Sequence, residues 1–178
     1  MIPGRRFAVL TLMALALAWA VPPAMAAKKK SGQVFLGQFG AWYAYQLNEK
    51  AGRVCYIVSK PVRMRGKYKK RGDVVVFVTH RPKDGERDVV NFQAGYTYKA
   101  GAKATARVDK RKFSLTTERD AAWSPNAAAD KVLVRAMVKG TRLVLTGRSR
   151  SGVTTTDTYS LKGFTRARKR INRACGVK

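Results

Sequence analysis

Hydrophobic residues between positions 42 and 116 follow the spacing of β-strands. Residues 42–47 are rich in aromatic side chains, and residues 54–58 and 74–78 are short, unbroken apolar runs with many β-branched residues. Such runs are typical of central strands buried on both faces. Phe113 and Leu115 alternate with polar neighbours, which is typical of a strand with one exposed face. The pattern predicts a series of short strands in this part of the chain.

Three later segments extend the strand pattern. The aromatic residues of segment 92–98 flank Gly95, which predicts a kinked or bulged pair of strands. Residues 132–138 and 143–145 are apolar runs separated by a glycine-containing turn, which predicts a β-hairpin. Residues 154–161 are Thr-rich and lie between turn residues, so we expect the last strand there.

After residue 163 the hydrophobic period changes to that of a helix. Thr165 can cap the start of this helix, and Gly176 can end it. The apolar side chains that fall on one helical face are Phe164, Ala167, Ile171, Ala174 and Cys175. The segment predicts a C-terminal α-helix with this face toward the sheet.

Turn residues recur at about eight to twelve positions, a spacing typical of all-β folds. We therefore expect an antiparallel β-sandwich, or a barrel-like sheet, with one C-terminal α-helix. Residues 34–178 are long enough for a single domain with a continuous core, and the polar segment 27–33 is expected to be a flexible leader.

The first 26 residues have the pattern of a signal peptide. Arg5 and Arg6 precede an apolar run from Phe7 to Val21, and small residues around Ala26 offer a cleavage site. A membrane anchor is the alternative, but the run is shorter than the roughly 20 residues that span a bilayer. We expect cleavage near Ala26 and a location in the periplasm, or secreted to the outer surface, with no transmembrane span afterwards.

Cys55 and Cys175 are the only cysteines in the chain. An exported protein folds where thiols are oxidised, so the two are expected to form a structural disulfide. Neither belongs to a Cys-x-x-Cys motif, which argues against a reactive or metal-binding pair.

The chain is strongly basic, with 37 Lys and Arg against 10 Asp and Glu. Removal of the two arginines of the signal peptide leaves 35 against 10, a net charge of +25 for the processed chain. Outside the cytoplasm such a charge favours anionic envelope polymers, lipid surfaces or host polymers, or an envelope protein, over nucleic acid. The alternative is a solvated cationic coat with no dedicated partner. The sequence does not indicate the oligomeric state.

Two basic clusters and a basic turn are candidate binding sites for polyanions. The first cluster is Arg63, Arg65, Lys67, Lys69, Lys70 and Arg71; the second is Arg166, Lys169, Arg170 and Arg173; the turn carries Arg148 and Arg150. Asp157, counted by twos along its strand, falls on the inward face and is expected to be a buried polar anchor. Tyr96 and Tyr98 share a strand face and are expected to pack there, with ring stacking on a ligand as the alternative.

Candidate catalytic and metal-binding residues are sparse. His80 is the only histidine, lies beside Arg81 and Pro82, and is expected to be a surface residue at a strand end. The acids are scattered among turns, and no phosphate-binding glycine motif occurs. We expect no catalytic residues, no metal and no cofactor. The alternative is a hydrolase acting on envelope polymers, with Asp157 or His80 in its site.

Several short strings resemble the invasion-associated locus B family. They are Cys55-Tyr56-Ile57-Val58-Ser59-Lys60-Pro61, the Val-Thr-His-Arg-Pro of 78–82, Val134-Arg135-Ala136-Met137 and, above all, Asp157-Thr158-Tyr159-Ser160-Leu161-Lys162-Gly163-Phe164. The resemblance runs from about Trp42 to Cys175. It implies an exported bacterial envelope protein with no established enzymatic activity, associated in some relatives with entry into host cells. It assigns no catalytic residues.

Overall fold

The computed structural model describes residues 32–68 and 70–177. The predicted signal peptide and nearly all of the predicted leader lie outside these residues. In chain order the elements are β1 (Gln33–Phe39), β2 (Trp42–Glu49), β3 (Gly52–Ser59), β4 (Arg63–Arg65), β5 (Val75–Arg81), the 3-10 turn η1 (Pro82–Asp84), β6 (Glu86–Gln93), β7 (Ala104–Val108), β8 (Arg111–Glu118), β9 (Ala121–Trp123), α1 (Ala127–Lys139), β10 (Arg142–Arg148), β11 (Thr154–Ser160) and α2 (Phe164–Cys175).

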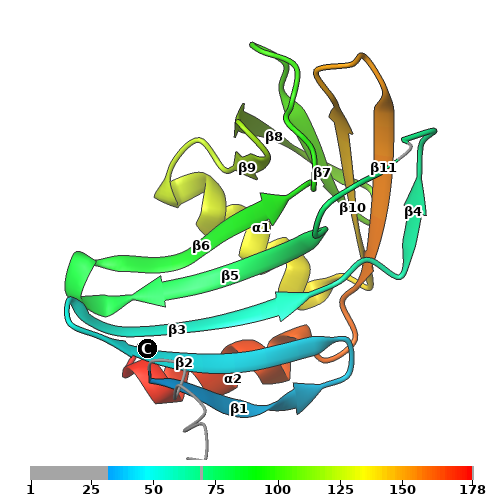
Figure 1. The fold of residues 1–178 in the computed structure, drawn as a ribbon. Coiled ribbons are helices and arrows are strands. Elements are labelled where there is room, and N and C mark those ends of the chain that lie inside the picture. The colour runs from blue at the N-terminus through cyan, green and yellow to red at the C-terminus, as the bar shows by residue number, and fades with distance from the viewer. Residues whose placement is uncertain (1–31, 69, 178) are drawn as a thin grey trace, which may run out of the picture.

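Within the described residues the strands form one open sheet of 11 strands in the order β1-β2-β3-β5-β6-β9-β8-β7-β10-β11-β4. Every paired neighbour is antiparallel. The sheet bends at β9 and β8, so that β7, β10 and β11 stand steeply against the long strands β2, β3, β5 and β6 (Figure 1). The predicted antiparallel β-fold with a C-terminal helix is confirmed.

The strands that the apolar runs predicted are present. Residues 54–58 lie in β3 and residues 74–78 fall in or directly before β5, at the centre of the first half of the sheet. Ile57, Val76 and Val78 are fully buried on its inner face. The kinked pair of strands predicted for residues 92–98 is only partly present. Tyr96 and Tyr98 follow β6 in an irregular stretch, because Gly95 takes a φ of +70° that ends the pairing of β6. Both tyrosines are buried and pack in the core.

The predicted hairpin at 132–145 is wrong in its first arm, because residues 127–139 form the helix α1. The Asn126 side chain caps its start by accepting the N–H of Ala129. Leu133 and Met137 are four residues apart and fully buried, so tertiary packing selects the helical period over the strand tendency of the valines. The second arm is a strand, β10, which pairs with β11 and β7.

The C-terminal helix α2 is confirmed, and Phe164, Ala167 and Ile171 are buried against the sheet. Its start differs from the prediction: Thr165 donates to the carbonyl of Val138 at the end of α1 and does not cap α2. Gly163 stands at the cap position, and Gly176 ends the helix in the left-handed conformation.

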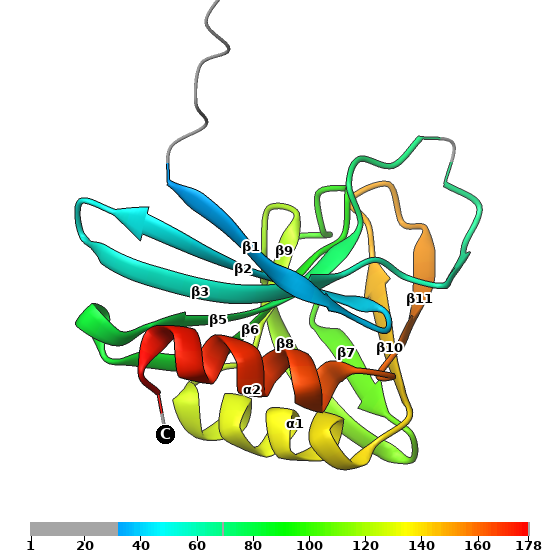
Figure 2. The ribbon, with the colours of Figure 1, turned by 90° about the horizontal axis from the view of Figure 1, so that it is seen from below.

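Both helices lie side by side on the inner face of the sheet, and α2 covers β2 and β3 (Figure 2). The expected disulfide between Cys55 of β3 and Cys175 of α2 is confirmed, with Cα atoms 6.0 Å apart. It joins the last helix to an early strand across 120 residues of sequence. None of the helices in the described part of the chain is long and apolar enough to cross a membrane.

Candidate functional site: a cationic groove between the helices and β6

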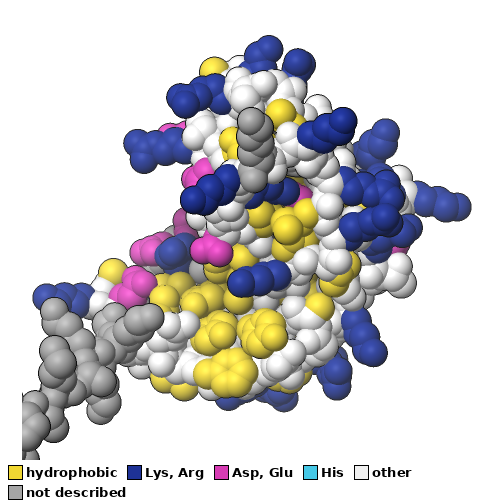
Figure 3. Space-filling model, turned by 45° about the vertical axis from the view of Figure 1, so that its right-hand side comes forward, with side chains coloured by type: hydrophobic (Ala, Val, Ile, Leu, Met, Phe, Trp, Pro, Cys, Tyr) yellow, Lys and Arg dark blue, Asp and Glu magenta, His cyan; other side chains and the backbone are white. Residues whose placement is uncertain are grey.

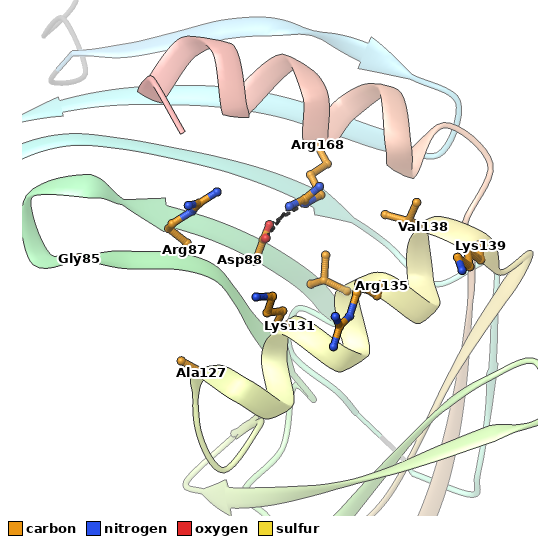
Figure 4. A pocket seen from close by; sticks show the side chains of 10 residues that line it. Gly85, Arg87, Asp88, Ala127, Lys131, Arg135, Val138, Lys139 and Arg168 are labelled. Atoms are coloured by element: carbon orange, nitrogen blue, oxygen red, sulfur yellow. Dashed lines mark hydrogen bonds and ion pairs between the residues drawn. The ribbon is translucent and has the colours of Figure 1, made fainter. Parts of the chain in front are cut away.

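A groove of about 640 Å³ lies where α1, α2 and the start of β6 meet. Its charged lining residues are Arg87, Asp88, Lys131, Arg135, Lys139 and Arg168. Five of these six are cations. Figure 4 shows that they come from three elements, with Lys131 and Arg135 on α1, Arg87 on β6 and Arg168 on α2.

Helix α1 supplies one side of the groove through residues spaced four apart. Lys131, Arg135 and Lys139 follow one another at successive turns and are exposed. Val134 and Val138 lie between them and give the groove an apolar floor. A ligand in this groove would meet aliphatic surface below and positive charge at the rim.

Asp130 anchors α1 to the sheet. Its carboxylate is buried and accepts the backbone N–H of Val90 in β6 at 3.1 Å. Burial raises the pKa of Asp130 above its ordinary value, and its hydrogen bonds act in the opposite direction. The hydrogen bond with Val90 fixes the rotation of α1 about its axis. It therefore determines which side chains of α1 contact the sheet and which line the groove.

The one carboxylate of the groove, Asp88, is already paired. Its two oxygens accept Nε and an Nη of Arg168 at 2.7 and 2.6 Å. This bidentate contact raises the pKa of Arg168, although burial of the guanidinium opposes the shift. The pair is close to neutral, so Arg87, Lys131, Arg135 and Lys139 dominate the potential of the groove. Among the described residues these four form no ion pair.

His80 lies directly behind Asp88 and is fully buried, so the prediction of a surface residue is wrong. Alternation along β5 turns its ring inward, beside Val76 and Val78. The backbone N–H of Asp88 donates to Nδ1 at 3.0 Å, and Nε2 lies 2.9 Å from Oδ1 of Asn172. Nδ1 is therefore an acceptor and Nε2 carries the proton. Burial lowers the pKa of His80, which keeps the imidazole neutral.

Asp157 is also fully buried, within the second half of the sheet. The two Nη atoms of Arg71 donate to its two oxygens, each at 2.7 Å, and Arg71 also donates to the carbonyl of Ala94. The guanidinium lies over the ring of Tyr96, 5.1 Å from its centre. The charges of Arg71 and Asp157 thus neutralise each other inside the fold. Neither Asp157 nor His80 lines the groove.

The cations expected to bind polyanions are distributed over separate surfaces. Arg63 and Arg65 are exposed on the edge strand β4, Lys67 and Lys70 on the loop after it, and Lys69 lies outside the described residues. Arg71 belongs to the same loop in sequence, but its charge is neutralised by Asp157. This loop and the two helices lie on different sides of the molecule (Figure 2).

The other candidates are also dispersed. Arg148 and Arg150 are exposed at the turn between β10 and β11. On α2, Arg166, Lys169 and Arg173 are exposed and Arg170 is half-buried, and none of the four lines the groove.

The groove residues were missed because 132–138 was interpreted as a strand. Two signals pointed to a helix: the Asn126 cap with three alanines after it, and the cations at 131, 135 and 139 with helical spacing. Arg87 and Arg168 carry no local signal, because only the fold brings β6 and α2 to α1.

Comparison with known proteins adds a family to this geometry. The family model for the invasion associated locus B protein matches residues 42–172. No curated protein sequence matches the chain. The crystal structure of the invasion associated protein B from Bartonella henselae has a similar fold, with a TM-score of 0.56 at 17% sequence identity over 79% of this chain and 97% of that chain. The match of the family model over most of the chain shows that this protein belongs to the invasion associated locus B family.

Proposed function

We propose that this protein is exported to the cell envelope and binds phosphate-, sulfate- or carboxylate-bearing polymers there, without catalysing a reaction. The observation that supports this most is the groove in which five cations from three elements surround one carboxylate that is already paired. Cations held by a folded scaffold bind an anion with less loss of side-chain freedom than a flexible basic tail does.

The anionic polymer is expected to bind in the groove rather than over the whole basic surface. The cations of β4, of the β10–β11 turn and of the outer face of α2 add long-range attraction, which speeds association but gives little selectivity. The family name refers to invasion, and any contact with host cells would use the same groove, because host-surface glycans carry sulfate and carboxylate groups.

The test compares two charge-reversal variants of the processed chain. One is Lys131→Glu with Arg135→Glu in the groove, and the matched control is Arg63→Glu with Lys67→Glu on the other side of the molecule. All four positions are exposed, so the two variants change the net charge equally at little cost to folding. Binding to lipopolysaccharide, peptidoglycan and heparin is measured by calorimetry across a series of salt concentrations.

We expect binding of the unaltered chain to weaken steeply with salt. The groove variant should lose about tenfold or more in affinity and show a shallower salt dependence, while the control loses about threefold or less. Equal losses in the two variants would show that only net charge matters. Affinity that does not change with salt would contradict anion binding altogether.

A further inference from the structure

The outer face of the first half of the sheet carries many apolar and aromatic side chains and few charges. In strands the side chains alternate between faces, and an antiparallel sheet with one solvated side carries polar residues there. Here the outer positions of β2, β3 and β5 include Tyr45, Tyr56 and Phe77, all half-buried. The helices cover the inner face, and no described residue covers the outer one (Figures 1 and 2).

One part of this face is an aromatic ridge across four strands. The ring centres of Phe35 and Tyr45 are 5.3 Å apart, those of Tyr45 and Tyr56 are 5.3 Å apart, and those of Tyr56 and Phe77 are 5.9 Å apart. Phe35, on the edge strand β1, has 57% of its surface exposed. Gln33 donates to the hydroxyl of Tyr56 and holds that ring in place.

Next to the ridge, and sharing Tyr56 and Phe77 with it, lies a hollow of about 400 Å³ that extends from the end of β2 across β3, β5 and β6 to β9. Val54, Phe77, Val89 and Trp123 contribute to its apolar lining. Its single charged lining residue is Arg81, which contacts Glu86 at 3.5 Å. Ridge and hollow therefore form one nearly uncharged surface, on which hydrophobic side chains gather in Figure 3.

Lack of charge on this face is unusual for a chain with so large an excess of cations. Two copies that met through most other surfaces would bring like charges together, at a cost in free energy. On the outer sheet face this repulsion is smallest. The face therefore suits a partner that is itself strongly cationic, and a second copy of the chain is such a partner.

Ring orientation argues against a sugar as the occupant. Sugars bind aromatic residues by stacking on exposed ring faces, but Tyr45 and Tyr56 stack on each other with planes 22° apart. The ring faces that these two tyrosines turn toward each other are covered and are not free to stack on a sugar. Packing against the aliphatic and aromatic side chains of another sheet does not require a free ring face.

We propose that the outer face of β1, β2, β3, β5, β6 and β9 is the interface of a two-fold symmetric dimer of this protein. A two-fold axis that runs parallel to the strands between β3 and β5, midway between two facing sheets, places β1 and β2 of one copy, with their end of the ridge, over β9 and β6 of its partner. The contact is isologous, so both hollows are filled at once.

The small size of the face limits the strength of the dimer. Six strands about 4.8 Å apart span about 24 Å, and five residues along a strand span about 17 Å. The footprint is then about 400 Å² per copy, below the roughly 800 Å² per partner of a standard interface. We therefore expect a dissociation constant in roughly the micromolar range.

The experiment is sedimentation velocity on the processed chain over a range of protein and salt concentrations. Salt screens the repulsion between the two cationic copies, so the dimer should strengthen as NaCl rises from about 50 to about 500 mM. This is the opposite of the salt dependence expected for anion binding. Emission from Trp123 should shift to the blue with dimer formation, since the other tryptophan of the processed chain, Trp42, is already buried.

Phe35→Lys should weaken the dimer by about tenfold or more, because it places a charge on each ridge. Val62→Lys is the matched control: Val62 has 65% of its surface exposed, lies off this face and gains the same charge. The Lys131→Glu, Arg135→Glu variant should still dimerise, so failure of the groove hypothesis and failure of the dimer can be told apart.

Three outcomes overturn the proposal. One is a chain that stays monomeric at all salt concentrations up to about millimolar protein. Another is equal weakening by Phe35→Lys and Val62→Lys. The third is a monomer whose Trp123 emission shifts on addition of phospholipid vesicles, which would make this face a lipid-binding surface instead.

Discussion

The buried carboxylates and the histidine inside this domain each have a specific partner. Asp130 accepts a backbone N–H of β6, Asp157 pairs with Arg71, and His80 lies between a backbone N–H and an asparagine. Burying such groups without partners would cost several kcal/mol each, roughly half the stability of a typical domain. The alternation along β11 indicates that Asp157 points inward, but its partner is 86 residues away and no local pattern identifies it.

His80 should make stability depend on pH. Its folded pKa lies below the ordinary value of about 6.5, so below that pH the unfolded chain binds more protons than the folded one. The free energy of unfolding should be constant with respect to His80 above pH 6.5 and fall as the pH drops through the window below it, by up to about 1.4 kcal/mol per pH unit. Urea unfolding at a series of pH values measures this slope.

Because the chain has one histidine, the control is simple. His80→Gln keeps a side-chain donor near Asn172 but cannot titrate, and its stability should be flat where the unaltered chain loses stability. The carboxylates are common to both chains, so the difference between the two slopes isolates the contribution of His80. An equal slope in both chains would show that His80 is not the group responsible.

Elements whose pattern is purely local could be predicted, and those decided by packing could not. Residues 54–58 are an unbroken run with β-branched residues and form β3, and residues 164–175 have a clear helical period and form α2. Residues 132–138 combine β-branched valines with a helical repeat, and contacts with β6 decide in favour of α1. The order of strands is also beyond local pattern, since β4 leaves its sequence neighbour β3 to pair with β11 at the far edge.

The junction of β11 and α2 depends on the absence of a side chain at Gly163. Its φ is +91°, and a Cβ atom there would lie 1.9 Å from the carbonyl oxygen of Phe39. Gly163→Ala should therefore lower the free energy of unfolding by about 2–3 kcal/mol, from backbone strain and the forced separation of the β1–β2 turn from α2. Chemical denaturation measures the loss.

Gly101 offers a matched control for this prediction. Its φ is +70°, and a Cβ atom there would have no neighbour within 4 Å. Gly101→Ala thus reports the cost of the left-handed backbone alone, which should be about 1 kcal/mol. If the two substitutions cost the same, the close approach of Phe39 to Gly163 does not contribute to stability.

On the scale of the whole molecule, different surfaces carry different chemistry. The cationic groove opens where the helices meet β6, and the uncharged aromatic surface covers the outside of the same half of the sheet. Composition predicts a basic surface, but it cannot show that Arg87, Lys131 and Arg168 converge, since they come from three distant segments. Nor can it show that cations such as Arg71 are neutralised inside the fold.

The disulfide acts at this scale because it closes a loop of 120 residues. Chain-entropy estimates for such a loop give about 4–5 kcal/mol. Reduction, or replacement of Cys55 and Cys175 together by Ala, should lower the free energy of unfolding by about that amount. Parallel urea titrations with and without reductant measure it, and the doubly substituted chain, unaffected by reductant, is the control. A loss below about 1 kcal/mol would mean that the unfolded chain is already compact without the bond.

Helix α2 covers β2 and β3, although more than 100 residues separate it from them in sequence. The ring of Phe164 packs edge-on against Trp42, with centres 4.9 Å apart. Without residues 164–175, Trp42 and its neighbours on the inner face of β2 and β3 would be open to water. This half of the sheet can therefore pack fully only when α2 has docked, so its order depends on a segment that is distant in sequence.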